Sequence, residues 1–185
     1  MVATQLRIGM TILHEGEPYK ALNVEHVTPG KGRGMVQTRL RNLKTDTTKE
    51  HRFRSDDKIE RVRLEQYEME FLYSTDSEYY FMNTENYEQI ALSKKDVKEE
   101  VHYLIPNVRV VMDFYEGNPV GIEPPQLVEL KVIDTPPHLK GATATSSMKA
   151  ATLETGMVVN VPSFVEAGDI IRVDTREGKY MERAR

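Results

Sequence analysis

Residues 21–43 read ALNVEHVTPGKGRGMVQTRLRNL, and their pattern is that of two β-strands joined by a turn. Residues 21–26 and 35–43 each place different kinds of side chain at alternate positions, which is the period of a β-strand. Residues 28–34, between them, contain one proline and three glycines. Two alternating segments around such a turn predict a β-hairpin with a glycine-rich tip.

The residues after this hairpin complete a first small β unit. Lys49–Arg54 and Ile59–Leu64 are predicted to form a further pair of strands. About five short strands in about 60 residues suit a small SH3-like barrel. We therefore expect a first domain over residues 1–63, with the hairpin as its most prominent feature.

A second β unit begins near Glu65. Four strands are predicted in it, at Tyr67–Ser74, Tyr79–Asn83, Val108–Tyr115 and Val120–Glu123. The first two are joined across residues 75–77, and the last two are joined by a turn at Gly117-Asn118. Pro124-Pro125 ends the unit, so the second domain is expected over residues 64–126.

One helix is predicted within this second unit, beginning at Ser93. Ser93 and Asp96 have the spacing of a capping pattern. Apolar side chains then recur at helical spacing, at Val97, Val101 and Leu104. Pro106 ends the pattern, because proline cannot continue a helix.

Residues 127–185 are predicted to form a third β unit. Its strands are expected at Val128–Asp134, Met157–Val161, Ile170–Thr175 and near Tyr180. The segment Gly141–Ala151 is rich in Ala, Ser and Thr and is expected to be a flexible loop. Five short strands with one long polar loop are typical of an OB-like barrel. The chain is thus expected to be mainly β, with three small barrels in series.

Charge is unevenly distributed along the chain. Residues 1–62 hold 12 Lys and Arg against 8 Asp and Glu, whereas residues 63–128 hold 5 against 13. Residues 129–185 are balanced, so the net charge of −4 hides a basic first unit and an acidic second unit. This pattern suits a partner that is polyanionic at one end only. A charge run taken alone is more often the solvated face of a strand pair.

Composition and spacing exclude several kinds of chemistry. The chain has no cysteine, which excludes disulfides, thiol catalysis and thiolate zinc sites. Its five histidines never lie three or four residues apart, so no metal site is expected. There is no Gly-x-Ser-x-Gly elbow, and acids such as Asp56-Asp57 are adjacent and point in different directions. We expect neither an enzyme nor a bound cofactor.

Location follows from the distribution of apolar residues. No apolar run approaches the ~18–20 residues that span a bilayer. The N-terminal residues MVATQLRIGMTILHEGEPYK lack the basic, apolar and small-residue order of a secretory signal. We expect a cytoplasmic protein, monomeric and without a membrane partner.

The hairpin tip is the most distinctive short motif, and it reads Pro29-Gly30-Lys31-Gly32-Arg33-Gly34. A nucleotide-binding loop needs a longer glycine spacing, a Ser or Thr after its lysine and a following helix, none of which this tip has. What the tip offers is a lysine flanked by glycines, which can reach into a narrow crevice and is open to a modifying enzyme. An isolated Pro-Gly-Lys-Gly is more often a plain turn.

Several motifs occur together in the order of one known family. They are Pro29-Gly30-Lys31-Gly32, Leu40–Leu43, Lys149–Gly156, Val161–Val165, Gly168–Arg176 and Tyr180. Each is weak alone, but in combination they cover essentially the whole chain, which resembles bacterial elongation factor P. The sequence departs from members with a modified lysine at Thr28, where lysine is common, and at Arg33–Met35. Ala150 stands where proline is common.

The resemblance implies a fold and a function. It implies a KOW-type SH3-like domain followed by two OB-fold domains, arranged as an L-shaped mimic of tRNA. Such factors bind the ribosome between the peptidyl and exit sites, next to peptidyl-tRNA and the rRNA of both subunits. They promote the first peptide bond and relieve stalling at consecutive prolines. In many bacteria an enzyme extends the tip lysine, here Lys31, and the sequence leaves its modification open.

Physical chemistry agrees with that role for Lys31. Proline is a poor, constrained nucleophile, so a small displacement of peptidyl-tRNA costs a large part of the reaction rate. A long cation at the tip can stabilise the tRNA backbone near its acceptor end, while the ribosome performs the chemistry. Further basic residues are expected to contact rRNA and tRNA phosphates: Arg39, Arg41, Lys44, Lys49, Arg52, Arg54 and Lys149.

Other classes of function fit the sequence less well. A stand-alone RNA chaperone with OB folds would show aromatic stacking platforms in a basic groove. The third unit has only Phe164 and Tyr180 as aromatic residues and no net charge, which counts against an RNA chaperone. A family paralogue without a role at prolines is disfavoured by the intact tip, and an enzyme by the lack of a catalytic constellation.

Overall fold

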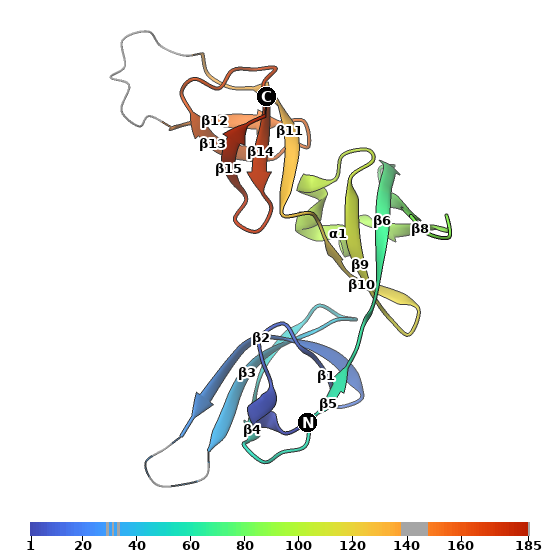
Figure 1. The fold of residues 1–185 in the computed structure, drawn as a ribbon, viewed down its shortest axis with the longest axis vertical. Helices are drawn as coiled ribbons and strands as arrows, with labels where there is room; N and C mark the ends of the chain where they lie inside the picture. The colour runs from blue at the N-terminus through green and yellow to red at the C-terminus, as the bar shows by residue number, and fades with distance from the viewer. Residues whose placement is uncertain (29, 31, 33, 138–147, 185) are drawn as a thin grey trace. The chain divides into compact units, whose positions relative to one another are not determined.

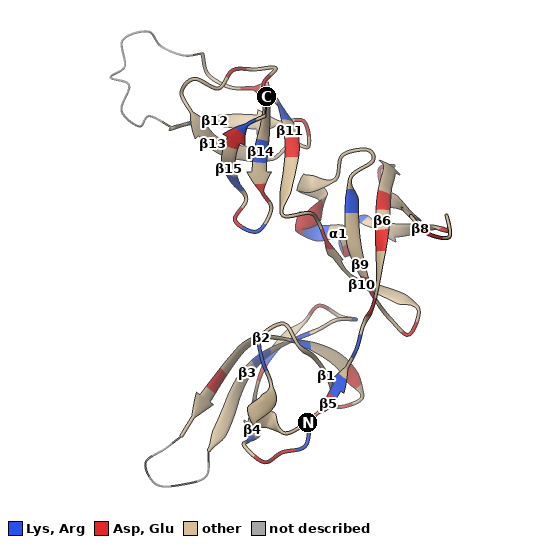
Figure 2. Ribbon diagram, in the orientation of Figure 1, with Lys and Arg blue, Asp and Glu red and all other residues tan. Residues whose placement is uncertain are grey.

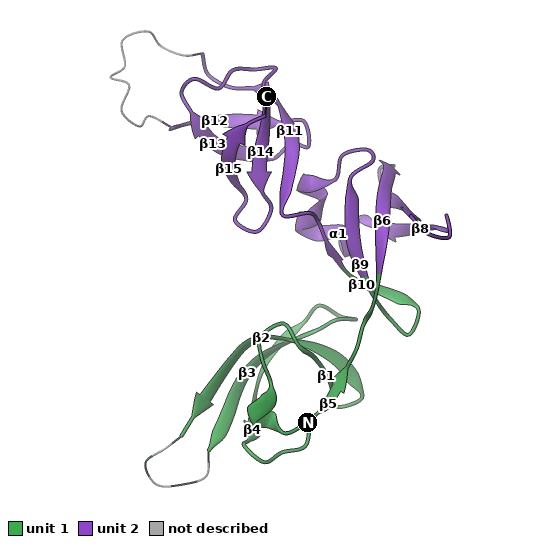
Figure 3. Ribbon diagram, in the orientation of Figure 1, with its two compact units in different colours: residues 1–66, 113–121 green, residues 67–112, 122–185 purple. Residues whose placement is uncertain are grey.

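The computed structural model describes all residues except 29, 31, 33, 138–147 and 185. The described chain forms three five-stranded sheets (Figure 1), which confirms the predicted mainly β architecture. It divides into two compact units (Figure 3). Unit 1 contains Met1–Gln66 and Asp113–Gly121, and unit 2 contains Tyr67–Met112 and Ile122–Arg185. The three domain boundaries expected from the sequence stay a prediction.

The first sheet has the strand order β4-β3-β2-β1-β5. Its elements are a short 3₁₀ helix η1 (Ala3–Gln5) and strands β1 (Thr11–His14), β2 (Glu17–Val27), β3 (Met35–Asn42), β4 (Thr48–Arg54) and β5 (Glu60–Val62). β2 and β3 pair antiparallel, which confirms the predicted hairpin. Alternate residues of β3 are buried, and they bring Val36 and Leu40 into a core with Leu6 and Ile12.

The pairing of the last two strands in this sheet differs from expectation. β4 pairs with β3, whereas β5 pairs with β1, so the predicted pair of Lys49–Arg54 with Ile59–Leu64 is wrong. The chain leaves β4 because Ile59 is buried in the core and its N–H donates to the carbonyl oxygen of Met1 at 2.8 Å. Alternation along a strand shows which face is buried and does not show which neighbour the strand takes.

The second sheet has the strand order β10-β9-β6-β7-β8. Its strands are β6 (Glu65–Ser74), β7 (Glu78–Asn83), β8 (Gln89–Ser93), β9 (Arg109–Tyr115) and β10 (Asn118–Glu123). Phe71, Phe81 and Met112 are buried in its core. β8 has no counterpart among the predicted strands, because a five-residue strand with one buried side chain shows little alternation.

The helix predicted from Ser93 is interrupted. A single α-helical turn, α1 (Lys94–Val97), is followed by a 3₁₀ helix, η2 (Lys98–Tyr103), and Lys98, where η2 begins, has φ of +50°. The Ser93 hydroxyl lies 2.6 Å from an Asp96 carboxylate oxygen instead of capping a backbone N–H. The prediction of one continuous helix is therefore wrong. No helix within the described residues is long and apolar enough to span a bilayer.

The third sheet has the strand order β13-β12-β11-β14-β15. Its strands are β11 (Leu127–Asp134), β12 (Met148–Leu153), β13 (Val158–Pro162), β14 (Ile170–Asp174) and β15 (Lys179–Arg183). The end of the predicted Gly141–Ala151 loop is wrong, because residues 148–151 belong to β12. Ala151 pairs with Val159 and is 1% exposed, so its short side chain serves core packing. Residues 141–147 of that loop lie outside the described residues.

Candidate functional site

The β2–β3 hairpin carries the predicted tip. Its last paired residues are Val27 on β2 and Met35 on β3, and the chain between them is residues 28–34. Three of the predicted tip residues, Pro29, Lys31 and Arg33, lie outside the described residues. The described part of the site consists of the two strands and the three glycines Gly30, Gly32 and Gly34.

The two strands of the hairpin differ in how far they are covered. From Glu25 to the end of β2 at Val27, and at Thr28 just after it, every residue is exposed. On β3, Val36 and Thr38 are buried, and the Thr38 hydroxyl donates to the carbonyl oxygen of His51 on β4 at 2.8 Å. One strand is thus anchored to the sheet, while its partner presents both faces to solvent near the tip.

The three glycines of the tip differ in their backbone conformation and in the space around them. Gly32 has φ of +136°, a conformation that side chains with a Cβ rarely adopt, and Gly30 has open space around it. Gly34 is at the base of the tip, where a Cβ would lie 2.6 Å from the Ser55 hydroxyl oxygen. The backbone N–H of Ser55 also donates to the carbonyl oxygen of Gly34 at 3.0 Å. Ser55 therefore fixes one end of the tip, a contact that no sequence signal revealed.

Gly34→Ala is expected to destabilise the protein through this contact. The added methyl group would force the Ser55 hydroxyl from its rotamer, at a cost of about 1 kcal/mol. Urea unfolding of Gly34→Ala measures the loss, and the same substitution in a Ser55→Ala background supplies the control. The loss should vanish in that background, where the next nearest atom lies at an ordinary contact distance of 3.6 Å. An equal loss in both backgrounds would contradict the explanation.

Three predicted phosphate contacts share one face of the first sheet. Arg52 is opposite Gln37, Arg54 is opposite Met35, and Arg39 is two residues along β3 from Gln37. All three arginines are exposed, and we call the face that carries them the outer face. Arg52 is held by its Nε and Nη2, which donate to Oε1 of Gln37 at 3.2 and 2.8 Å. Of these three arginines, Arg54 lies nearest the tip along the strands, because it pairs with Met35, the first residue of β3.

Lys49 points away from this outer face. It alternates with the arginines along β4 and shares the inner side with the buried Phe53. Its Nζ donates to Oε2 of Glu15 at 2.5 Å and lies 4.7 Å from the centre of the Tyr19 ring. The Glu15 hydrogen bond raises the pKa of Lys49 and lowers that of Glu15. The alternation of residues 49–54 already contained the signal that Lys49 and Arg52 face opposite sides.

Two histidines lie beside Lys49 on the inner side. The rings of His14 and His51 are 4.4 Å apart, and both contact Phe53. Burial lowers the pKa of His14, and the nearby Lys49 cation lowers it further. A neutral His14 imidazole suits this half-buried aromatic cluster. Among the described residues no group of three potential ligands could hold a metal ion.

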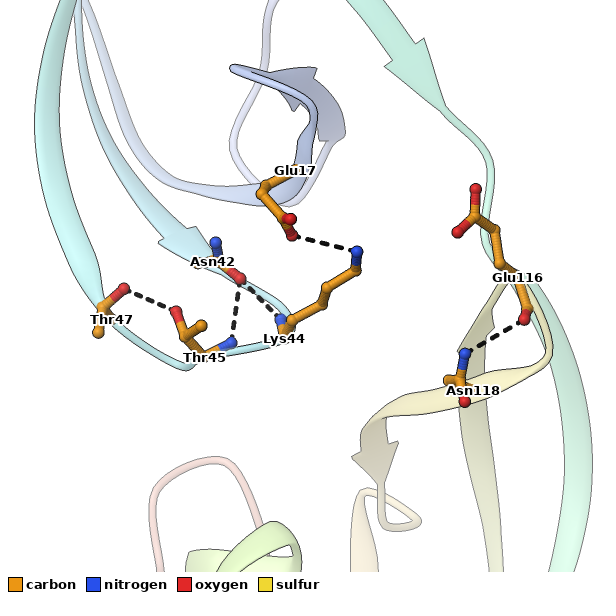
Figure 4. Close-up of polar contacts among 7 residues, drawn as sticks. All are labelled: Glu17, Asn42, Lys44, Thr45, Thr47, Glu116 and Asn118. Carbon is orange, nitrogen blue, oxygen red and sulfur yellow. Dashed lines mark hydrogen bonds and ion pairs between the residues drawn. The ribbon is translucent and has the colours of Figure 1, made fainter.

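The other predicted cations have partners within the protein. Arg41 Nε is 3.6 Å from Asp46, and Lys44 Nζ is 3.2 Å from Glu17 (Figure 4). In the third sheet, Lys149 donates to the carbonyl oxygen of Pro136 at 2.6 Å. The predicted RNA-binding residues therefore do not form a single surface. Arg39, Arg52 and Arg54 share the outer face, and their role in RNA binding stays a prediction.

Part of unit 2 is acidic, in contrast to the basic outer face of the first sheet. Figure 2 shows acidic segments on β6, where Glu68 lies exposed and Glu70 is half-buried. Glu68 accepts a hydrogen bond from Nη1 of Arg109 at 3.0 Å. One of these acidic side chains is thus neutralised within its own sheet.

Three family models match successive parts of the chain. Residues 2–59 match the elongation factor P (EF-P) KOW-like domain, and residues 64–122 match the elongation factor P (EF-P) OB domain. Residues 128–183 match the elongation factor P C-terminal model. The three matches fall on the three sheets in order, although the first ends just before β5, and together they extend over almost the whole chain.

Relatives of full length agree with these matches. The elongation factor P of Acidobacterium capsulatum is 53% identical over 182 residues, which cover 98% of each chain. That of Alkaliphilus metalliredigens is 48% identical over 181 residues, again 98% of each chain. That of Moorella thermoacetica is 44% identical over 185 residues, which cover all of both chains.

A solved structure shares the fold at low identity. The eukaryotic translation initiation factor 5A from Methanococcus jannaschii aligns with a TM-score of 0.53 and 18% identity. The alignment covers 67% of this chain and 93% of that one. The motifs, the three sheets and the full-length relatives lead to one conclusion: the chain belongs to the elongation factor P family of translation elongation factors.

Proposed function

We propose that this protein stimulates peptide-bond formation on the ribosome and relieves stalling at consecutive prolines. In this proposal it binds between the peptidyl and exit sites, and Lys31 acts near the acceptor end of the peptidyl-tRNA. The protein contributes position and charge, while the ribosome performs the chemistry. No catalytic residue, metal ion or bound cofactor of its own takes part.

The observation that carries the proposal is the asymmetric β2–β3 hairpin. Its anchored strand, β3, fixes the direction of the hairpin through the Thr38 and Val36 contacts, while the end of β2 is exposed. A hairpin anchored on one strand and exposed on the other suits entry into a narrow crevice. Productive geometry in a slow reaction depends on such positioning, because small displacements reduce the rate steeply.

We also propose that a lysine-modifying enzyme extends Lys31. An added cationic chain would lengthen the reach of the tip without changing the fold that carries it. A mass measurement of the peptide that contains Lys31, from protein purified from its own organism, tests this proposal. An unmodified mass would leave the lysine side chain itself as the acting group.

The experiment that tests the function is translation of two messages in a reconstituted system, with and without the protein. One message encodes three consecutive prolines, and the other lacks them. We expect acceleration confined to the proline message. Equal acceleration of both messages, or none with protein purified from its own organism, would contradict the proposal.

Arg54→Ala is expected to weaken ribosome binding in a salt-dependent way. The Arg54 side chain is exposed next to the tip, and no described carboxylate forms an ion pair with it. Loss of one phosphate contact should lower the slope of log affinity against log salt by about 1. Binding is measured over a series of salt concentrations.

The matched control for this experiment is Arg172→Ala. The Arg172 guanidinium is held by Glu129 at 3.0 Å and Glu182 at 2.6 Å, so it is already neutralised within the third sheet. We expect Arg172→Ala to leave the salt slope unchanged. If both substitutions changed the slope equally, the outer face would have no special part in binding.

A further inference from the structure

Lys44 lies between two parts of unit 1 that are far apart in sequence. Its Nζ is 3.2 Å from Oε2 of Glu17 and 5.7 Å from the centre of the Tyr115 ring. Glu17 begins β2, whereas Tyr115 ends β9. Although β9 and β10 belong to the second sheet, residues 113–121 at the end of their hairpin belong to unit 1 with Lys44.

The turn that carries Lys44 is held firmly by Asn42 (Figure 4). Oδ1 of Asn42 accepts hydrogen bonds from the backbone N–H groups of Lys44 and Thr45 at 2.8 and 3.0 Å. Asn42 is 4% exposed, and the hydroxyls of Thr45 and Thr47 lie 2.8 Å apart. The backbone of Lys44 is therefore fixed, and its side chain projects from a rigid base.

The end of the β9–β10 hairpin is equally well defined. Glu116 and Gly117 have φ of +50° and +77°, as a two-residue hairpin turn requires. Nδ2 of Asn118 donates to the carbonyl oxygen of Glu116 at 3.3 Å (Figure 4). Gln66 donates to Oδ1 of Asp113 at 2.7 Å, which ties the start of this segment to residues 1–66.

The charges around Lys44 suit a cation at this position. Oε2 of Glu17 is shielded from solvent, although the Glu17 and Lys44 side chains are 40% and 45% exposed, and the ammonium of Lys44 compensates this carboxylate across 3.2 Å in a half-exposed ion pair. Burial and the neighbouring Glu116 raise the pKa of Tyr115, while Lys44 opposes that rise. The neutral Tyr115 ring and the Glu17 carboxylate thus face the same ammonium.

We infer that Lys44 is a positioning residue, whose ammonium holds the end of the β9–β10 hairpin in unit 1, and that it makes no phosphate contact. The inference goes beyond the proposed function, because it concerns how the unit that carries Lys31 is held together. A loosened unit presents its tip less accurately. We therefore expect Lys44→Ala to reduce the acceleration at prolines by roughly 10-fold without loss of ribosome affinity.

A distance measurement tests this inference directly. Because the chain has no cysteine, Glu50→Cys and Pro119→Cys create a unique pair of spin-label sites, both exposed and both in unit 1. The otherwise unaltered protein should give one narrow distance distribution. Lys44→Ala and Lys44→Met should broaden it, and Lys44→Arg should restore it, since arginine keeps the cation.

The Tyr115 side of the contact supplies a second series. Tyr115→Phe keeps the ring face and should keep the narrow distribution, whereas Tyr115→Leu should broaden it. Combining Tyr115→Leu with Lys44→Ala should broaden it no further, because both remove the same contact. Lys95→Ala, at an exposed lysine in unit 2, is the control and should change nothing.

Two results would overturn the inference. One is an unchanged distribution in Lys44→Ala. The other is a reduced salt slope of ribosome binding in Lys44→Ala, as expected for Arg54→Ala, which would make Lys44 a phosphate contact. The distances are measured on the free protein, so their outcome is independent of whether the proposed function at prolines is correct.

Discussion

Lys31→Ala is expected to remove most of the acceleration at consecutive prolines while the protein stays folded. If the tip acts by placing a cation beside the peptidyl-tRNA, its loss should lower the rate at prolines by about 10²-fold. The neighbouring Gly30 and Gly32 are exposed, so the substitution should change the free energy of unfolding by less than about 0.5 kcal/mol. Reconstituted translation of the proline message measures the rate, and circular dichroism checks the fold.

Two further variants separate the causes of that loss. Lys58→Ala removes an exposed lysine elsewhere in unit 1 and should leave the rate unchanged. Lys31→Arg keeps a cation but removes the amine that a modifying enzyme would extend. Partial activity of Lys31→Arg would assign part of the effect to charge alone. Full activity of Lys31→Ala would contradict the proposed role of the tip.

Leu40→Ala is expected to have the largest effect on stability. Leu40 lies on β3, is fully buried, and packs in the core with Leu6 and Ile12. Removing its side chain leaves a cavity, which should cost about 3 kcal/mol. Because the chain has no tryptophan, urea unfolding is best followed by circular dichroism. Two units can unfold separately, so the transition of unit 1 is the quantity to compare.

The control for Leu40→Ala is the same deletion on the neighbouring strand. Leu22 lies at an irregular position of β2 and is 36% exposed. Leu22→Ala should therefore cost about 1 kcal/mol or less, since solvent can fill the space that its side chain leaves. Equal losses from the two substitutions would show that β3 does not anchor the hairpin through its buried face.

The elements that the sequence predicted well are those with a strong local signal. Alternation along residues 35–43 fixed both the strand and its buried face, and the glycines of residues 28–34 marked the turn. The family resemblance rested on motifs spread over all three sheets. The Gly34–Ser55 contact could not be predicted, because it joins two turns whose closeness depends on how β3 and β4 pair.

The errors share one physical origin, namely that pairing and packing decide what short segments do. The sequence places residues 148–151 of β12 in a loop, because Ala and Thr are uninformative until Val159 is placed opposite Ala151. The sequence predicts the basic residues from Arg39 to Arg54 as one set of phosphate contacts. Strand alternation divides it, with Lys49 inward and Arg52 outward, and Lys44 has its own partners.

Unit 1 is not a continuous piece of the polypeptide, since it combines residues 1–66 with residues 113–121. A fragment that stops at Gln66 would lack Asp113, which accepts the hydrogen bond from the Gln66 side chain. It would also lack Tyr115, whose ring lies beside the Lys44 ammonium. Truncation just after the first sheet therefore removes residues 113–121, which contribute contacts to unit 1. During synthesis, the unit that carries the tip can be completed only after the ribosome has made residue 121.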